Sequence, residues 1–278
     1  MIKFPVIEFY ITNVCNLECR GCNRFNNYNF KGHQYWNDYA TEIEAWSTRI
    51  DPKQITILGG EPLLNPDLEK WASNLRRLWP KSNIMIQTNG TYQRPEHLEY
   101  WDKYEVGFGI SLHDTRTAHE IRKKWEGVIS DEAIMDGFVF RQASIIKTDD
   151  YFTLHKSDPK SAFVACGMSH DHTISEGKLY ACPVMSVLPL FRKQFNLKLS
   201  SYQQELLDAY RPLEFNCSEE ELQNFADTTI YNPMPQCEFC PQNLKWHAPL
   251  EDYDNLDPIK YDPNPMLPED YFNILKKS

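Results

Sequence analysis

In the first half of the chain, stretches with the apolar pattern of a strand alternate with stretches with the apolar pattern of a helix. The stretches 6–12 and 54–58 are short and mainly apolar, as is typical of strands. Elsewhere apolar residues recur every three or four positions, as on one face of a helix; they are Trp36, Tyr39, Ala40, Ile43, Trp46 and Ile50, then Leu68, Trp71, Ala72, Leu75 and Leu78. The alternation predicts a βα barrel with both helices in its outer ring and their tryptophans in the core.

The signals at the helix starts and in the next strand refine this picture. Asn65 and Pro66 form a cap-and-start pair for the second helix, and Pro95 opens a third. Residues 106–112 alternate bulky with small side chains, which predicts a strand with one face under helices and one facing a ligand cavity. Tight barrel packing would explain the glycines equally well. Residues 137–147 are expected to form one more strand.

Patterning in the second half is less regular. Residues 172–181 contain a Glu-Gly turn between two short apolar strands, which predicts a β-hairpin. Helical spacing returns from 190 to 211. The acidic run 219–221 is expected to be a helix start or a solvated face.

Polar stretches between 148 and 160 indicate a domain boundary. We therefore expect one domain at 1–148, a second at 149–248, and a tail at 249–278 that follows the surface or orders on contact.

Composition narrows the class of protein. The chain has 278 residues and a net charge of −10, which argues against a general nucleic-acid binder but leaves a local basic patch open. No apolar run is long enough to span a bilayer, and Lys3 and Glu8 interrupt any signal-peptide core. We expect a cytoplasmic protein without membrane contact, in which the cysteine spacing indicates metal sites rather than disulfides.

Three of those cysteines stand in one loop directly after the first strand, as Cys15-x3-Cys19-x2-Cys22. Three thiolates can hold three corners of a cubane iron–sulfur cluster, which leaves the fourth iron open to a ligand. The alternatives are a structural zinc site, which usually has paired C-x2-C modules, and three unrelated buried thiols. The short spacing favours the cluster.

A second motif, Gly59-Gly60-Glu61-Pro62, ends the strand at 54–58. Two glycines let backbone approach a ligand without an intervening Cβ, while the strand end offers carbonyls and a carboxylate to an ammonium group. Taken alone, this motif would be an ordinary turn.

Together the two motifs resemble those of the radical S-adenosylmethionine (radical SAM) enzymes. The resemblance implies that Cys15, Cys19 and Cys22 hold a [4Fe–4S] cluster that binds SAM, and that the Gly59–Pro62 segment binds the SAM amino group. It also implies SAM or substrate contacts for Ser111 and for Gln87 and Asn89 in Gln87-Thr88-Asn89-Gly90, at strand ends where barrel active sites assemble. One departure is Gly21, where the family often has an aromatic residue near adenine.

A further cysteine set follows in the second half, as Cys166-x15-Cys182 and Cys237-x2-Cys240. The predicted hairpin would bring its two flanking cysteines together, and the later pair would complete four ligands. Such a shell suits either a second [4Fe–4S] cluster or a tetrahedral zinc. Cys217 is left over and is expected to be a free or buried thiol.

This half resembles the twitch domain, a shortened relative of the SPASM domain that binds one auxiliary cluster in some radical SAM enzymes. The resemblance favours an auxiliary [4Fe–4S] cluster at Cys166, Cys182, Cys237 and Cys240 over zinc. The expected fold is therefore α/β, a partial (β/α)6 TIM-like barrel followed by a small α+β twitch-like domain.

The activity implied by the family is reductive cleavage of SAM and hydrogen-atom abstraction from a substrate. A four-ligand auxiliary cluster favours net oxidation, an oxidoreductase acting on a small polar molecule, with a flavodoxin- or ferredoxin-type protein as reductant. Alternatives are redox-neutral rearrangement, a maturase that modifies a peptide, and a non-enzymatic metal scaffold. His113 and Asp114 follow the strand at 106–112 and are candidates for acid and base, although such a pair is more often plain surface.

Overall fold

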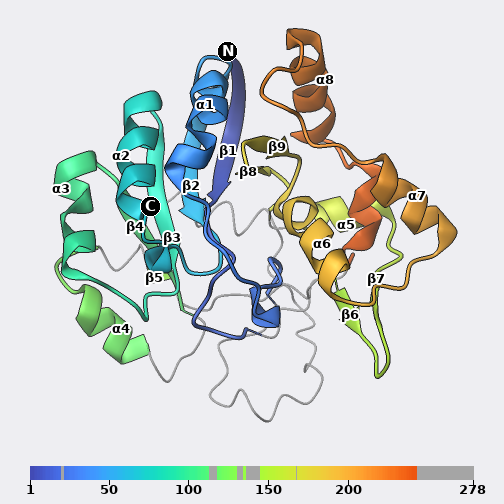
Figure 1. Cartoon of the computed structure of the whole chain (residues 1–278), viewed down its shortest axis with the longest axis horizontal. Coiled ribbons are helices and arrows are strands. Elements are labelled where there is room, and N and C mark those ends of the chain that lie inside the picture. Colours follow the sequence, from blue (N-terminus) through green and yellow to red (C-terminus); the bar gives the residue numbers. More distant parts are fainter. Residues whose placement is uncertain (20–21, 113–117, 130–133, 136–144, 167, 243–278) are drawn as a thin grey trace.

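The computed structural model describes residues 1–19, 22–112, 118–129, 134–135, 145–166 and 168–242 (Figure 1). Its strands are β1 (Ile2–Tyr10), β2 (Ile50–Leu58), β3 (Asn83–Thr88), β4 (Gly107–Ser111), β5 (Ile134–Met135), β6 (Ile145–Lys147), β7 (Phe152–Leu154), β8 (Asp171–Ser175) and β9 (Lys178–Tyr180). Its α-helices are α1 (Trp36–Ser47), α2 (Leu68–Leu78), α3 (Tyr100–Tyr104), α4 (Ala118–Trp125), α5 (Pro159–Val164), α6 (Pro183–Gln194), α7 (Ser201–Ala209) and α8 (Glu219–Thr229). Four 3-10 helices are η1 (Asn26–Tyr28), η2 (Pro62–Leu64), η3 (Pro95–Glu99) and η6 (Pro235–Phe239).

One mostly parallel sheet organises the described residues. Its strand order is β5-β4-β3-β2-β1-β8-β9, and every neighbouring pair is parallel except the antiparallel β8 and β9. Helices α1 and α2 connect consecutive parallel strands, as βαβ units require. This is the α/β architecture that the sequence predicts, consistent with a partial TIM-like barrel. No helix in the described ranges is long and apolar enough to cross a membrane.

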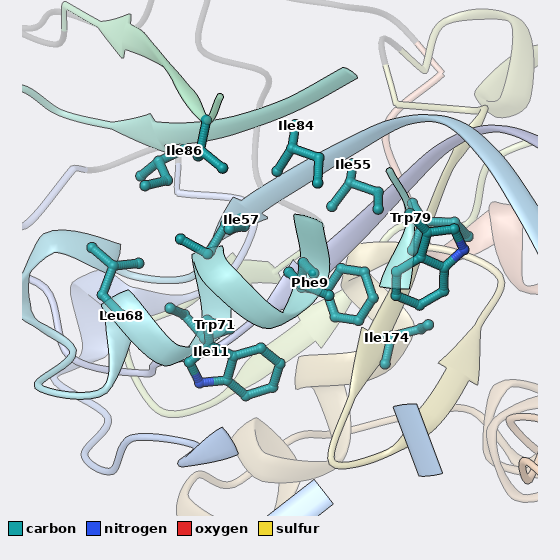
Figure 2. Packing of buried hydrophobic residues seen from close by; sticks show 14 of the residues in the cluster. Phe9, Ile11, Ile55, Ile57, Leu68, Trp71, Trp79, Ile84, Ile86 and Ile174 are labelled. Carbon is teal, nitrogen blue, oxygen red and sulfur yellow. The ribbon is translucent and has the colours of Figure 1, made fainter. Parts of the chain in front are cut away.

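One face of the sheet is apolar and lies under the helices. Phe9 of β1 contacts the rings of Trp71 and Trp79, with centroids 6.2 and 5.7 Å apart. Figure 2 shows these rings alongside the labelled isoleucines of β2 and β3. The indole N–H of Trp71 donates to the Gln34 carbonyl at 3.0 Å, and that of Trp46 donates to the Gly177 carbonyl at 2.9 Å. The predicted core tryptophans Trp36, Trp46 and Trp71 are thus buried, and the indole N–H groups of the last two have partners.

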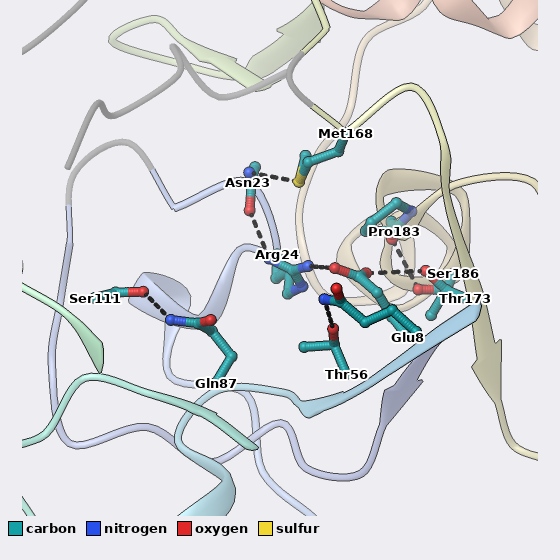
Figure 3. Close-up of polar contacts among 11 residues, drawn as sticks. Glu8, Asn23, Arg24, Thr56, Gln87, Ser111, Met168, Thr173, Pro183 and Ser186 are labelled. Atoms are coloured by element: carbon teal, nitrogen blue, oxygen red, sulfur yellow. Dashed lines mark hydrogen bonds and ion pairs between the residues drawn. The ribbon is translucent and has the colours of Figure 1, made fainter. Parts of the chain in front are cut away.

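The opposite face of the same strands is polar. Because side chains alternate along a strand, the residues between the core positions point to the other side. They include Glu8 of β1, Thr56 of β2, Gln87 of β3, Ser111 of β4 and Thr173 of β8 (Figure 3). Near the ends of β1 and β2, Tyr10 and Leu58 on this side pack in a second apolar cluster with residues of α6.

The predicted hairpin is confirmed as β8 and β9. Its register pairs Ser175 with Lys178, so Glu176 and Gly177 form a two-residue loop, and both have positive φ angles, 50° and 73°. That geometry is the one expected of a type I′ turn. The first hairpin strand also pairs with β1, so the hairpin extends the N-terminal sheet. A domain division after residue 148 stays a prediction.

Several predicted helices differ in their bounds. The stretch at 190–211 is two helices, because α6 ends at Gln194 and the side chains of Ser200 and Gln203 cap a new start for α7. The acidic run 219–221 begins α8 behind a Ser218 cap, as predicted.

Two helices in the first half of the chain also begin at other residues than predicted. Helix α2 begins at Leu68 rather than at Pro66. Asn65 Oδ1 accepts from the Asp67 amide at 2.8 Å just before the helix, while Nδ2 donates to the Ile11 and Gln34 carbonyls. Pro95 opens the 3-10 helix η3, which continues into α3. Most of the expected strand at 137–147 and all of the tail at 249–278 lie outside the described residues.

Candidate active site at the two cysteine groups

The first cysteine group lies in the loop that leaves β1. Cys15, Cys19 and Cys22 are each half-buried, and the Cys22 amide donates to the Cys19 carbonyl at 3.1 Å, which folds the loop back on itself. Burial, followed by the negative charges of Glu61 and Cys22, raises the pKa of Cys15 to about 11. Burial and the other two thiols raise the pKa of Cys19 to about 12. Bound positive charge, such as that of an iron cluster, would stabilise the thiolate forms of Cys15 and Cys19.

The two glycines after β2 hold this loop against the sheet. The Gly60 amide donates to the Thr12 carbonyl at 2.8 Å, and the Glu61 amide donates to the Val14 carbonyl at 2.8 Å. A Cβ on Gly60 would lie 2.6 Å from the Val14 carbonyl carbon and 3.0 Å from the Cys15 Cβ. The glycines therefore make room for the cysteine loop itself, which is a different reason from the ligand approach that the sequence suggested.

Glu61 is fully buried, and its carboxylate accepts hydrogen bonds from within the protein. Its Oε1 accepts from the Leu63 amide at 3.0 Å and the Thr88 hydroxyl at 2.7 Å, while Oε2 accepts from the Asn89 amide at 2.8 Å. Burial raises its pKa to about 7, although the hydrogen bonds act in the opposite direction. A carboxylate has about four acceptor positions, so one remains on Oε2. Binding of the SAM amino group by residues 59–62 stays a prediction; Pro62, also assigned there, is buried at the start of η2.

Asn89 supports the cysteine loop from the end of β3. Its Nδ2 donates to Asn16 Oδ1 at 2.9 Å, and Asn16 Nδ2 donates to the Thr91 hydroxyl at 2.8 Å. Asn16 lies next to Cys15, so these amides tie the first cysteine to the strand end. The sequence singled out Asn89 but not Asn16, whose partner is 73 positions away.

Two other predicted residues meet on the polar face. Gln87 Nε2 donates to the Ser111 hydroxyl at 2.7 Å, across the register that pairs β3 with β4 (Figure 3). A side chain on Gly109 would meet Gln87 Oε1 at 2.8 Å, so the glycine leaves space for this pair. His113 and Asp114 lie outside the described residues.

The structure brings the four later cysteines together. Cys166, Cys182, Cys237 and Cys240 line one cavity of about 40 Å³. Burial, and then the other three thiols, raise the pKa of Cys182 well above its ordinary value. The geometry arises because Cys182 precedes α6 at the end of the hairpin, while the Cys240 amide donates to the Cys237 carbonyl at 3.1 Å around η6.

The number of thiols in each group bears on the metal that it could hold. Among the described residues, no three His, Cys, Asp or Glu side chains are placed to hold one metal ion. A zinc ion binds four thiolates at about 2.3 Å, whereas each thiolate of a cubane binds a separate iron. Cys217 lies apart from both groups, with Arg49 Nη1 at 3.5 Å from its sulfur. That Cys217 is a thiol outside the metal sites stays a prediction.

The loops of the two cysteine groups touch each other. Asn23, next to Cys22, donates from Nδ2 to the Met168 sulfur at 3.3 Å, and Met168 lines the four-cysteine cavity (Figure 3). Arg24 forms an ion pair with Glu8 on the polar face of β1. Sequence reasoning missed this pair, although a glutamate in a mainly apolar strand was the available signal.

Comparison with known proteins identifies the class of protein. A family model described as the radical SAM superfamily matches residues 9–156, more than half of the chain. The chain belongs to the radical SAM superfamily, which supports an enzymatic role. Membership implies SAM and a SAM-binding [4Fe–4S] cluster.

Individual relatives are more distant. The chain is 40% identical over 90 residues to a probable GTP 3′,8-cyclase of Methanocaldococcus jannaschii, which covers 30% of this chain and 28% of that protein. It is 29% identical over 92 residues to the GTP 3′,8-cyclase of Nautilia profundicola, which covers 32% and 29%. The chain thus spans less than a third of the length of these curated relatives.

A solved structure matches over nearly the whole chain. The crystal structure of BtrN in complex with AdoMet and 2-DOIA has a TM-score of 0.51 and 16% sequence identity, and the match covers 91% of this chain and 98% of BtrN. At this identity the likeness shows the fold alone.

Proposed function

We propose that this protein is a radical SAM oxidoreductase that dehydrogenates a small polar molecule with the help of an auxiliary [4Fe–4S] cluster. Cys15, Cys19 and Cys22 hold the SAM-binding cluster. The later four cysteines hold the auxiliary cluster in a twitch-like part of the chain. The supporting observation is the single cavity that all four later cysteines line.

The donor set fits two clusters. The first group has three thiols, which leaves one iron open for SAM, and the second has four, which leaves none open. A closed cluster cannot bind the substrate directly, so its suitable role is to accept an electron. When bound, SAM and the first cluster together supply the radical that removes a hydrogen atom from the substrate.

The protein's own residues position and shield these groups. Gly60 and Asn16 fix the first cysteine loop against the strand ends, and Glu61 crosslinks β2 to β3 beneath it. Gln87 and Ser111 present an amide and a hydroxyl on the polar face, where a polar substrate can be oriented. The partners in this proposal are that substrate and a flavodoxin- or ferredoxin-type reductant.

Anaerobic reconstitution with iron and sulfide counting tests the proposal. We expect about eight irons per chain, falling to about four in Cys237→Ser and staying at about eight in the matched Cys217→Ser. Zinc at the second site, or unchanged iron in Cys237→Ser, would contradict the auxiliary cluster.

A second assay isolates the first group. Under strong reduction the reconstituted protein should release 5′-deoxyadenosine from SAM, whereas Cys19→Ala should not. Cleavage of SAM by Cys19→Ala would disprove the assignment of the first cluster.

A further inference from the structure

The two ends of the first cysteine loop are tied together by buried side chains. The loop runs from Asn13 to Asn26, and its three cysteines all lie between these residues. Asn26 Nδ2 donates to the Asn13 carbonyl at 2.9 Å, so one side-chain amide closes the loop at its base. Asn26 is only 4% exposed, and breaking this bond would therefore leave buried polar groups without a partner.

Tyr10, the last residue of β1, completes this arrangement. Its hydroxyl donates to Asn13 Oδ1 at 2.9 Å and accepts from Asn26 Nδ2 at 3.0 Å. Its ring is buried in the second apolar cluster, which also contains Phe25 and Phe191. The strand and the packing of the ring fix the phenol, so its hydroxyl holds both asparagines in place. Tyr10, Asn13 and Asn26 together are called the loop clamp.

The backbone after Cys22 bends to reach the loop clamp. Phe25 has a φ of 57°, in the left-handed region that a bulky residue rarely adopts. Its amide donates to the Cys22 carbonyl at 3.2 Å, and its fully buried ring lies edge-on to that of Phe191, with centroids 5.3 Å apart. Burial of the ring offsets the cost of this conformation, which turns Asn26 back toward β1.

The loop clamp uses no atom of a cysteine side chain. Its hydrogen bonds join a phenol, two side-chain amides and one backbone carbonyl, so they can form whatever the three thiols bind. Both N–H groups of Asn26 are committed to these bonds, and its Oδ1 lies 3.9 Å from the Cys22 sulfur. The loop is therefore held next to its third cysteine by contacts that do not depend on a metal.

We propose that the loop clamp positions the first cysteine loop, and Cys22 in particular, for binding its cluster. Tyr10 and Asn26 are positioning residues in this role, because they act on the cluster only through the loop. Ordering a loop costs conformational entropy, so a loop that is already closed binds its ligand more tightly. The inference deepens the proposed function and rests on its assignment of the first cluster.

Alkylation of the metal-free, full-length protein by iodoacetamide, followed at each site by mass spectrometry, tests the loop clamp. Cys15, Cys19 and Cys22 react when the loop opens, whereas Cys217 lies outside the loop and serves as a reference within the same chain. Tyr10→Phe removes only the hydroxyl. Losing the hydrogen bonds of one buried group shifts a local opening equilibrium about tenfold, so we expect the loop cysteines to react about tenfold faster and Cys217 at its wild-type rate.

Further variants assign the effect to the amide of Asn26. Asn26→Ala should open the loop at least as far as Tyr10→Phe does, and combining the two should add little, because both act through the same hydrogen bonds. Asn26→Gln keeps both N–H donors and should react more slowly than Asn26→Ala. The matched control Tyr202→Phe removes a hydroxyl from an exposed side chain of α7 and should change no rate.

Three results would overturn the loop clamp. Wild-type rates in Tyr10→Phe would show that these bonds do not hold the loop, and equal acceleration of Cys217 would show general unfolding instead. Equal rates for Asn26→Gln and Asn26→Ala would show that the amide is not the group responsible.

Iron release measures the consequence for the cluster. In a Cys237→Ser background, which should carry only the first cluster, Tyr10→Phe should lose iron to a chelator about tenfold faster; an unchanged rate would refute the positioning role. Absent iron or absent SAM cleavage in the wild-type protein would instead refute the proposed function, whatever the alkylation rates.

Discussion

Replacing Gly60 by alanine should separate the cysteine loop from the sheet. The new methyl group would lie 2.6 Å from the Val14 carbonyl carbon and 3.0 Å from the Cys15 Cβ. Backbone atoms cannot rotate away as side-chain ends can, so the loop or the strand end must shift. Overpacking of this kind costs about 2 kcal/mol, which corresponds to a fall in Tm of roughly 4–8 °C for a chain of this size.

The matched control is Gly109→Ala. Its methyl group would meet the end of the Met85 side chain and the Gln87 Oε1 at 2.8 Å, both of which can rotate away. We expect this variant to unfold within about 2 °C of the wild type and to keep all of its iron.

Differential scanning calorimetry and iron counting after anaerobic reconstitution measure both effects. Gly60→Ala should lose about four irons per chain, because Cys15 shifts with the loop. If Gly60→Ala unfolds at the wild-type temperature and keeps all its iron, the close approach between the loop and the glycines does not hold the first cysteine in place.

Three further perturbations test the fold around the site. Arg24→Met should lower the free energy of unfolding by roughly 3 kcal/mol in urea titrations, because it leaves the buried Glu8 carboxylate without its cation. The double variant Arg24→Met, Glu8→Gln should recover most of this loss, and no recovery would argue against the ion pair. Burial lowers the pKa of His172 to about 4, so below pH 6.5 the unfolded chain binds a proton that the folded chain does not, and this residue should reduce stability by about 3 kcal/mol from pH 6.5 to 4. His97 has a similarly lowered pKa, so His172→Gln should remove about half of their joint slope in chemical denaturation series; an unchanged slope would contradict the lowered pKa of His172. Trp46→Phe leaves the Gly177 carbonyl without its donor and should cost about 2 kcal/mol by calorimetry; an unchanged Tm would contradict that bond.

The sequence predicted those features of the fold that depend on local periodicity. The strand at 106–112 alternates, and the structure places Phe108 and Ile110 in the core with Ser111 on the other face. The Glu176-Gly177 turn also predicted its hairpin correctly, because a two-residue loop with positive φ angles has a recognisable composition.

Long-range contacts were beyond the reach of such patterns. Asn65 has the composition of a helix cap, yet its amide bridges two distant carbonyls, and the helix starts at Leu68. The predicted contact of Glu61 with a ligand stays a prediction, and the three hydrogen bonds that its carboxylate accepts from the protein were not foreseen. Glu8 was considered only as an interruption of an apolar run.

The sequence located the cysteine motifs but did not reveal the contacts that support them. Spacing identified all seven cysteines that the structure gathers into two groups, because metal-ligand spacing is itself a local property. It did not reveal the support from Asn16 or the contact of Asn23 with Met168, since the partners lie 73 and 145 positions away. Contacts between such distant positions form only when the sheet has assembled.

The pairing of β8 with β1 has a mechanical consequence. The strand that leads into the first cysteine loop is bonded edge to edge with the hairpin that carries Cys182 at its far end. The first cysteine loop and Cys182 are therefore anchored to one continuous ladder of backbone hydrogen bonds, so their separation is fixed by the pairing of β1, β8 and β9. Cys237 and Cys240 are anchored differently, because the Ser157 amide donates to the Glu238 carbonyl at 3.0 Å.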